Sequence, residues 1–167
     1  AIRAETAVRA GNLVYAQKKY KDAIAFYEIG RPSEAPDFWK KLAHLGLIQS
    51  NFALNDYNAV IQIFNEVRPQ FPDSARPQVF FLVGESYRLL KKNKEAMDQY
   101  DFILSEFPKE NVAEPSAWAR LLLLQGSPKF IDETAAFLAK FPSSDRVPLV
   151  KLMRADAFFE KEQFNLC

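Results

Sequence analysis

The sequence predicts an all-α fold made of repeated helix pairs. Three aromatic-proline pairs each close a stretch of helical pattern, and they lie 36 and then 34 residues apart: Phe71-Pro72, Phe107-Pro108 and Phe141-Pro142. A fixed period of this size is typical of helical repeat arrays. Because one helix pair cannot bury its apolar face alone, neighbouring pairs must stack, and we expect an extended superhelix rather than a globule.

The composition fits an array of helices and narrows the classes of function. Of the 167 residues, 49% are apolar and 26% are charged, and no apolar run is long enough to cross a membrane. The net charge of +1 supplies no long-range field for nucleic acid or anionic lipid. We therefore expect no nucleic-acid partner and no direct membrane insertion.

Catalytic, metal-binding and cofactor-binding patterns are absent from the sequence. One Cys and one His exclude a disulfide framework and a zinc site built mainly from these ligands. His44 lies among leucines without an identifiable nucleophile or orienting carboxylate, and Cys167 has no local nucleophile context. No glycine-rich phosphate loop occurs. The sequence therefore predicts a chain that is not an enzyme, with no catalytic residues, no metal and no cofactor.

The first predicted repeat covers residues 4–35. Small residues, Ala10 and Gly11, stand in its first helix, and Ala23 and Tyr27 stand in its second. Small side chains let two helices approach closely, and a tyrosine fills the space beside them. Gly30 and the prolines after it end the second helix.

The second predicted repeat covers residues 36–74 and is longer than average. Its first helix is expected to begin near Pro36, because Asp37 leads directly into a helical apolar spacing. Ile48 stands at the position where the first and third repeats have glycine, while Val60 and Phe64 occupy the small and large positions of the second helix.

The third predicted repeat, residues 75–111, has the clearest pattern. It reads Phe80-x2-Val83-Gly84-x2-Tyr87, then Ala96-x3-Tyr100, then Pro108. This pattern resembles the tetratricopeptide repeat at nearly every position. The exposed run Lys91-Lys92-Asn93-Lys94 is expected to be a solvated turn between its helices.

The last two predicted repeats cover residues 112–144 and 145–167. The fourth reads Trp118-x2-Leu121, stops near Gly126 and restarts in a helix that ends at Lys140, so we expect its turn to be about four residues short. The fifth shows only its first helix, which suggests a segment of a longer protein. Prolines precede the first helices of three repeats, where a missing N–H is harmless; they are Pro77, Pro115 and Pro148.

The tetratricopeptide resemblance implies a specific architecture and a binding face. It implies one right-handed superhelical α-solenoid of antiparallel helix pairs over residues 1–167, with about four and a half repeats. In this family the first helices line a concave groove that receives a peptide. Carried over to this sequence, the groove candidates are Asn12, Tyr15, Gln49, Phe52, Phe81, Glu85, Arg88 and Arg120. Phe52 and Phe81 fit packing between repeats equally well.

A non-catalytic protein-interaction scaffold, which binds a protein or peptide in this groove, is therefore the function that the sequence favours. Two alternatives stay open: a structural or regulatory arm of a larger enzyme or envelope lipoprotein, and a self-association module that forms a homo-oligomer through exposed repeat ends. Residues 69–110 also resemble repeats of bacterial envelope proteins, including outer-membrane assembly lipoproteins and factors of the Tol system. This resemblance favours the periplasm or cell envelope over the cytoplasm.

Overall fold

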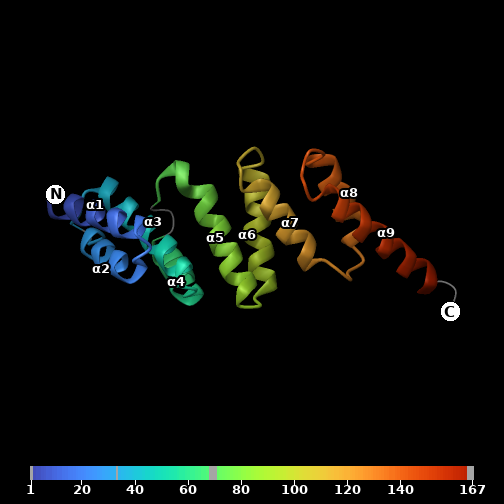
Figure 1. Cartoon of the computed structure of the whole chain (residues 1–167), viewed down its shortest axis with the longest axis horizontal. Coiled ribbons are helices and arrows are strands. Elements are labelled where there is room, and N and C mark those ends of the chain that lie inside the picture. The colour runs from blue at the N-terminus through green and yellow to red at the C-terminus, as the bar shows by residue number, and fades with distance from the viewer. Residues whose placement is uncertain (1, 33, 68–70, 165–167) are drawn as a thin grey trace. The chain divides into compact units, whose positions relative to one another are not determined.

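The computed structural model of the protein describes residues 2–32, 34–67 and 71–164, with side chains up to Lys161 (Figure 1). The described residues form helices and no strands, so the predicted all-α class is confirmed. A short 3-10 helix, η1 (Asp73–Ala75), lies before the fifth helix. The α-helices are α1 (Ile2–Ala16), α2 (Tyr20–Gly30), α3 (Asp37–Ala53), α4 (Tyr57–Val67), α5 (Arg76–Leu89), α6 (Asn93–Glu106), α7 (Ala113–Leu123), α8 (Phe130–Lys140) and α9 (Val147–Phe164).

The helix ends follow the glycine and proline signals of the sequence. Helix α2 ends at Gly30, and α3 begins directly after Pro36, as predicted. The prolines expected ahead of the first helices lie inside their first turns instead, because α5 begins at Arg76 and α9 at Val147. A proline is harmless there too, since the first-turn N–H groups have no partner within the helix.

The chain divides into two compact units, residues 1–99 and residues 100–167. The boundary falls inside α6. In the first unit, α1 contacts α2 and α3, and α3 contacts α4 and α5 (Figure 1). The first helices of the first three predicted repeats thus contact one another in succession, while α2 packs against both α1 and α3, and α4 against both α3 and α5.

Tyr27 of α2 joins the first two helix pairs. Its side chain is buried and lies against Gly11 of α1 and Gly46 of α3. A Cβ at Gly11 would come within 2.7 Å of the Tyr27 ring, and one at Gly46 within 2.3 Å, so both positions require glycine. The contact with Gly46 extends the small-to-large packing expected within the first helix pair to the next pair.

The three-residue turns inside the first three helix pairs share one geometry. Each has a residue in the left-handed region with φ of 61°, namely Lys18, Asn55 and Lys91. The N–H of this residue donates to the carbonyl of the residue three positions earlier. The N–H of the following residue donates to the carbonyl five positions before its own. This is the Schellman arrangement, which satisfies the last carbonyls of a helix. The turns thus repeat every 37 and then 36 residues.

The second unit has a different turn between α7 and α8. Six residues, 124–129, separate these helices, and Gly126 has φ of 79°. The expected four-residue shortening of this turn is therefore wrong. The fourth repeat is short because α7 and α8 have 11 residues each, whereas α5 and α6 have 14 each.

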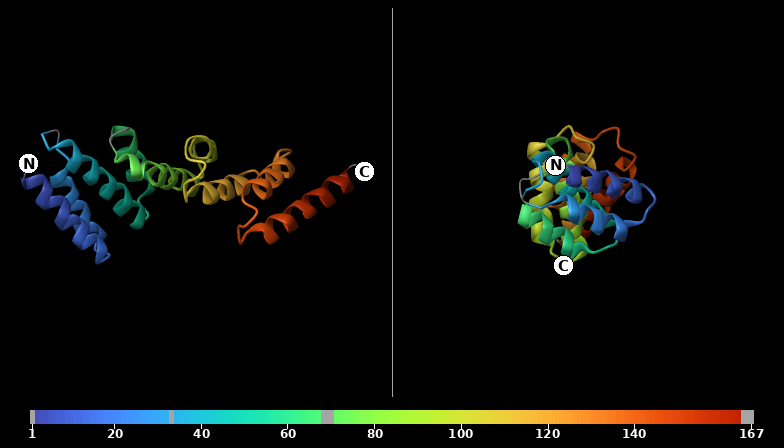
Figure 2. Two further views of the ribbon diagram at one scale, coloured as in Figure 1. Left: turned by 90° about the horizontal axis from the view of Figure 1, so that it is seen from above. Right: turned by 90° about the vertical axis from the view of Figure 1, so that its left-hand side faces the viewer.

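Helices α7, α8 and α9 share one apolar core in the second unit. Four buried residues form its centre, and Trp118 and Met153 pack against it. Figure 2 shows α9, in red, as one continuous helix that closes the described chain. The four central residues are Leu121, Phe130, Phe137 and Val150.

The Phe-Pro pairs end second helices in a repeated way. The N–H groups of Phe107 and Phe141 make the last helical hydrogen bonds of α6 and α8. Each phenylalanine carbonyl then accepts a hydrogen bond from the N–H of the residue three positions later, which is Glu110 or Ser144. The carbonyl of that residue in turn accepts a hydrogen bond from the first N–H of the next helix. Proline follows the phenylalanine because it cannot continue the helix. The spacing of 34 residues thus reappears in the backbone hydrogen bonds.

Candidate protein-binding face

The predicted groove residues of the first unit occupy equivalent positions on α1, α3 and α5. The position six residues before the left-handed turn residue holds Asn12, Gln49 or Glu85. The position three residues before it holds Tyr15, Phe52 or Arg88. Because the turns share one geometry, these side chains occupy the same place on each helix. We call these six residues together with Phe81 the first-helix face.

Asn12 and Tyr15 lie at the α1 end of this face. Asn12 is exposed, and its Oδ1 accepts a hydrogen bond of 2.8 Å from the Tyr27 hydroxyl. Burial, and then the nearby Tyr15, raise the pKa of Tyr27 to about 12, so this hydroxyl remains a donor at neutral pH. The Tyr15 ring packs edge-on against Tyr20 at 5.3 Å, and burial also raises the pKa of Tyr15.

The middle of the face is formed by α3. Phe52 is half-buried, and its ring packs edge-on against Tyr57 at 5.6 Å. This contact repeats the contact of Tyr15 with Tyr20, so both aromatic rings brace the turn to the second helix. Part of the role of Phe52 is therefore packing. Gln49 is half-buried one helical turn before it, and a partly exposed amide of this kind can hydrogen-bond a peptide main chain.

The α5 end of the face carries charge. Arg88 and Glu85 form a bidentate ion pair, in which Arg88 Nε donates to Glu85 Oε1 at 3.0 Å and Arg88 Nη2 donates to Glu85 Oε2 at 2.6 Å. Phe81 is half-buried one helical turn before Glu85. The face thus changes from amide and aromatic groups on α1 and α3 to a paired charge on α5.

Arg120 lies in the second unit and interacts with two carboxylates there. Its Nε donates to Asp101 Oδ1 at 2.5 Å, and its Nη1 forms an ion pair with Glu133. These ion pairs connect α7 to α6 and α8. The guanidinium of Arg120 therefore holds helices together, and a ligand would have to displace one of these carboxylates to reach it.

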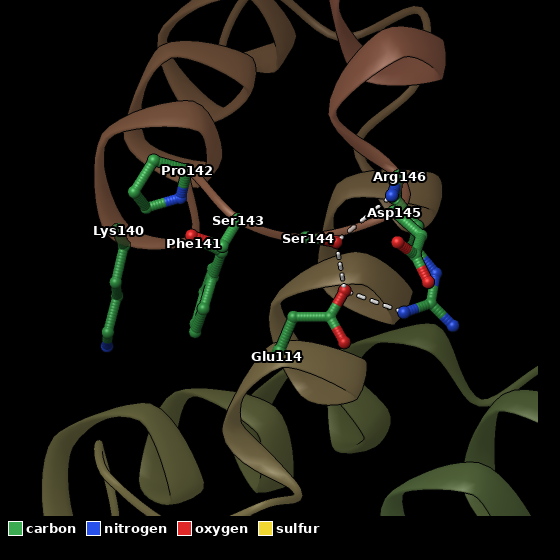
Figure 3. A pocket seen from close by; sticks show the side chains of 8 residues that line it. All are labelled: Glu114, Lys140, Phe141, Pro142, Ser143, Ser144, Asp145 and Arg146. Atoms are coloured by element: carbon green, nitrogen blue, oxygen red, sulfur yellow. Dashed lines mark hydrogen bonds and ion pairs between the residues drawn. The ribbon is translucent and has the colours of Figure 1, made fainter.

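A pocket of about 470 Å³ lies beside the linker between α8 and α9 (Figure 3). Glu114 of α7 accepts hydrogen bonds from the Ser144 hydroxyl at 2.8 Å and from Arg146 Nη1 at 2.6 Å. The Arg146 guanidinium also lies 5.5 Å from the centre of the Trp118 ring. Figure 3 shows the side chains of Glu114, Ser144 and Arg146 close together, with those of Lys140 and Phe141 away from them.

The contacts of Glu114 with Ser144 and Arg146 have a structural role, and we call these three residues the Glu114 joint. Burial alone would raise the pKa of Glu114, but the hydrogen bonds from Arg146 and Ser144 and the charge of Arg146 lower it below its ordinary value. The same groups fasten the α8–α9 linker to the start of α7.

Sequence reasoning did not find this joint. Glu114 and Arg146 are 32 residues apart, and no local motif connects them. The available signal was the similar spacing of the two Phe-Pro linkers, which places Glu110 and Ser144 at equivalent positions. Glu110 cannot donate the hydroxyl hydrogen bond that Ser144 donates to Glu114, so the joint belongs to the second linker.

Other residues considered in the sequence analysis have structural roles or lie outside the described chain. The His44 side chain is buried, and its ring lies 6.5 Å from that of Phe71. Cys167 lies outside the described residues. Residues 2–32, 34–67 and 71–164 contain no cluster of His, Cys, Asp and Glu that could hold a metal ion. Among these same residues, none of the helices is both long and apolar enough to span a bilayer.

Comparisons with protein-family models, with curated proteins and with solved structures give no match to this chain.

Proposed function

We propose that this chain is a non-catalytic protein-interaction scaffold that binds a peptide or protein through its first-helix face. In this proposal the helix pairs stack as a right-handed, tetratricopeptide-like solenoid. The main support is the repeated register of the first unit, where three successive first helices place their candidate residues at the same distance from equivalent turns. Such a regular surface suits an extended ligand, which has a repeat of its own.

The chemistry of the face also suits a peptide. Aromatic rings and arginine often anchor interfaces, and here they occupy one register position on three helices. The amides of Asn12 and Gln49 can pair with the N–H and C=O groups of a peptide backbone. The adjacent apolar ring of Phe81 can accept an apolar side chain.

The test uses two substitutions at positions that the described hydrogen bonds and ring contacts leave unused. Gln49→Ala with Phe81→Ala should weaken capture of a partner roughly tenfold or more, because two anchors are removed. Capture is measured by pull-down from the source organism with quantitative mass spectrometry. The matched control is Gln62→Ala with Asn65→Ala on the exposed side of α4. Equal capture by both double variants, with helicity intact in circular dichroism, would reject the first-helix face.

Self-association is a second candidate because of the outer surface of α9. Leu152 and Phe159 are 58% and 64% exposed, and Leu149 is 48% exposed on the same side. Large exposed apolar patches are rare on monomeric proteins. Leu152→Glu with Phe159→Glu should convert a dimer to a monomer in sedimentation experiments. A wild-type chain that sediments as a monomer at high concentration would exclude this candidate.

A further inference from the structure

The second unit contains a pocket that neither the first-helix face nor the Glu114 joint involves. It has a volume of about 560 Å³ and lies between the α7–α8 turn, the first turn of α8 and the C-terminal half of α9. We name it the α8–α9 pocket. Its lining includes four buried or half-buried apolar residues, Phe130, Ile131, Met153 and Ala157, which we call its floor. It also includes three exposed acidic residues, Asp132, Asp156 and Glu160, which we call its rim.

The floor and rim follow from the spacing on α9. Met153 and Ala157 are four residues apart and form one row, which packs against the core of the second unit. Asp156 and Glu160 are also four residues apart and form the next row outward. Asp132 lies on α8 across the pocket. An apolar floor is therefore bordered by carboxylates on two helices.

The rim has a strong charge imbalance. Three carboxylates line the pocket, against one cation, Lys161. The described ion pairs of the chain use none of these three carboxylates, and all three residues are exposed. The carboxylates of Glu114 and Glu133 in the same unit do form ion pairs. The rim thus offers an unneutralised negative field around an apolar surface.

We propose that the α8–α9 pocket binds a segment of another protein that carries one large apolar side chain flanked by lysine or arginine residues. The apolar side chain would cover the floor formed by Met153 and Ala157. The flanking cations would pair with Asp132 on one side and with Asp156 or Glu160 on the other. The volume is sufficient for a leucine or methionine side chain with its adjacent backbone.

The ligand chemistry can be tested with three labelled peptides and the full chain. The probe is acetyl-Lys-Lys-Leu-Lys-Lys-amide, and its controls replace Leu by Gly or every Lys by Glu. Fluorescence anisotropy should show binding of the Lys-Leu peptide that weakens with salt, roughly tenfold weaker binding of the Gly peptide, and none of the Glu peptide. Equal affinity for the Leu and Gly peptides, or no binding of either, would overturn the proposal. Displacement of the Lys-Leu peptide by spermidine at the same concentration as the peptide would also overturn the proposal, because a site for any polyamine would then explain the binding.

The location of the site is tested with substitutions. Asp132→Lys with Asp156→Lys should reduce affinity for the Lys-Leu peptide by at least about tenfold, because two attractive charges become repulsive. Asp98→Lys, on the exposed side of α6, changes net charge without touching the pocket and is the control. Ala157→Phe should fill the floor and abolish the preference for Leu over Gly while keeping the rim charges. Equal losses with Asp98→Lys and with the double variant would place binding elsewhere. The Gln49→Ala, Phe81→Ala double variant should bind the peptide normally, so this result is independent of the first-helix face.

Discussion

Residues 1–99 and residues 100–167 contain helix pairs of one type but stabilise them by different means. In the first unit, glycine and aromatic residues interlock, and Tyr27 fills the space that Gly11 and Gly46 leave. In the second unit, ion pairs connect neighbouring elements, with Arg120 joining α6, α7 and α8, and Glu114 joining α7 to the α8–α9 linker. The interlocked packing thus lies between helix pairs with three-residue turns, and the Arg120 ion pairs connect the helices on both sides of the six-residue α7–α8 turn.

The two tryptophans allow each unit to be measured separately. Trp39 lies on α3 in the first unit, and Trp118 lies on α7 in the second. A Trp118→Phe background leaves Trp39 to report the first unit, and a Trp39→Phe background leaves Trp118 to report the second. Urea unfolding monitored by fluorescence then gives a midpoint for each unit, without the assumption that the chain unfolds in one step.

The largest effect is expected at the glycines. Gly46→Ala should destabilise the first unit by about 3 kcal/mol, because the new Cβ would lie 2.3 Å from the Tyr27 ring. Gly126→Ala should cost the second unit only about 1 kcal/mol, because its Cβ would meet no atom within 4 Å and only the positive φ is unfavourable. Both values come from the urea midpoints. Equal losses at the two glycines would remove the distinction between interlocked and open packing.

The next effect concerns the Glu114 joint. Because the folded-state pKa of Glu114 is lowered, this carboxylate stabilises the second unit above its ordinary pKa, and the stabilisation is lost as the pH falls through the folded value. Glu114→Gln should therefore destabilise the second unit by about 1 kcal/mol at pH 7. The gap between variant and wild type should narrow as the pH falls below the ordinary pKa of a glutamate.

The control for the joint is Glu110→Gln, which changes an exposed carboxylate in the preceding linker. It should leave the Trp118-reported midpoint within about 0.5 kcal/mol of wild type at both pH values. A constant gap between Glu114→Gln and wild type from pH 7 to pH 3 would show that the side chain contributes through packing and not through its charge.

The smallest effect is a gain in stability at the regular turns. Lys91 adopts φ of 61°, which is unfavourable for a residue with a Cβ. Lys91→Gly should stabilise the chain by about 0.5 kcal/mol, the difference between the relieved strain and the added freedom of the unfolded chain. Lys92→Gly changes the neighbouring residue, which lies outside the left-handed region, and should stabilise nothing. A loss of stability in Lys91→Gly would mean that the lysine side chain stabilises this turn.

The helices of the first unit were predictable because their signals are local. Gly30 and Pro36 set helix ends, and small and aromatic residues recur at a fixed period. The prediction for the fourth repeat was wrong because the length of the repeat shows that it has fewer residues than the third, but not which element has lost them. Sequence spacing assigned the loss to the turn, whereas the helices themselves are shorter. The Glu114 joint and the Arg120 ion pairs were not predicted, because they connect residues that are 13 to 32 positions apart. Charged residues and serine are common on helix surfaces, so their presence alone does not indicate which of them pair.

The position of Tyr27 has a consequence for how the first unit opens. The ring of this α2 residue touches two other helices, so α2 cannot detach without exposing Gly11 on one side and Gly46 on the other. Local unfolding of the first helix pair should therefore be coupled to that of the second. In hydrogen exchange, the amides of α1, α2 and α3 are then expected to exchange as one group, with a common opening free energy. A chain built from repeated pairs would in this region behave as a single cooperative block.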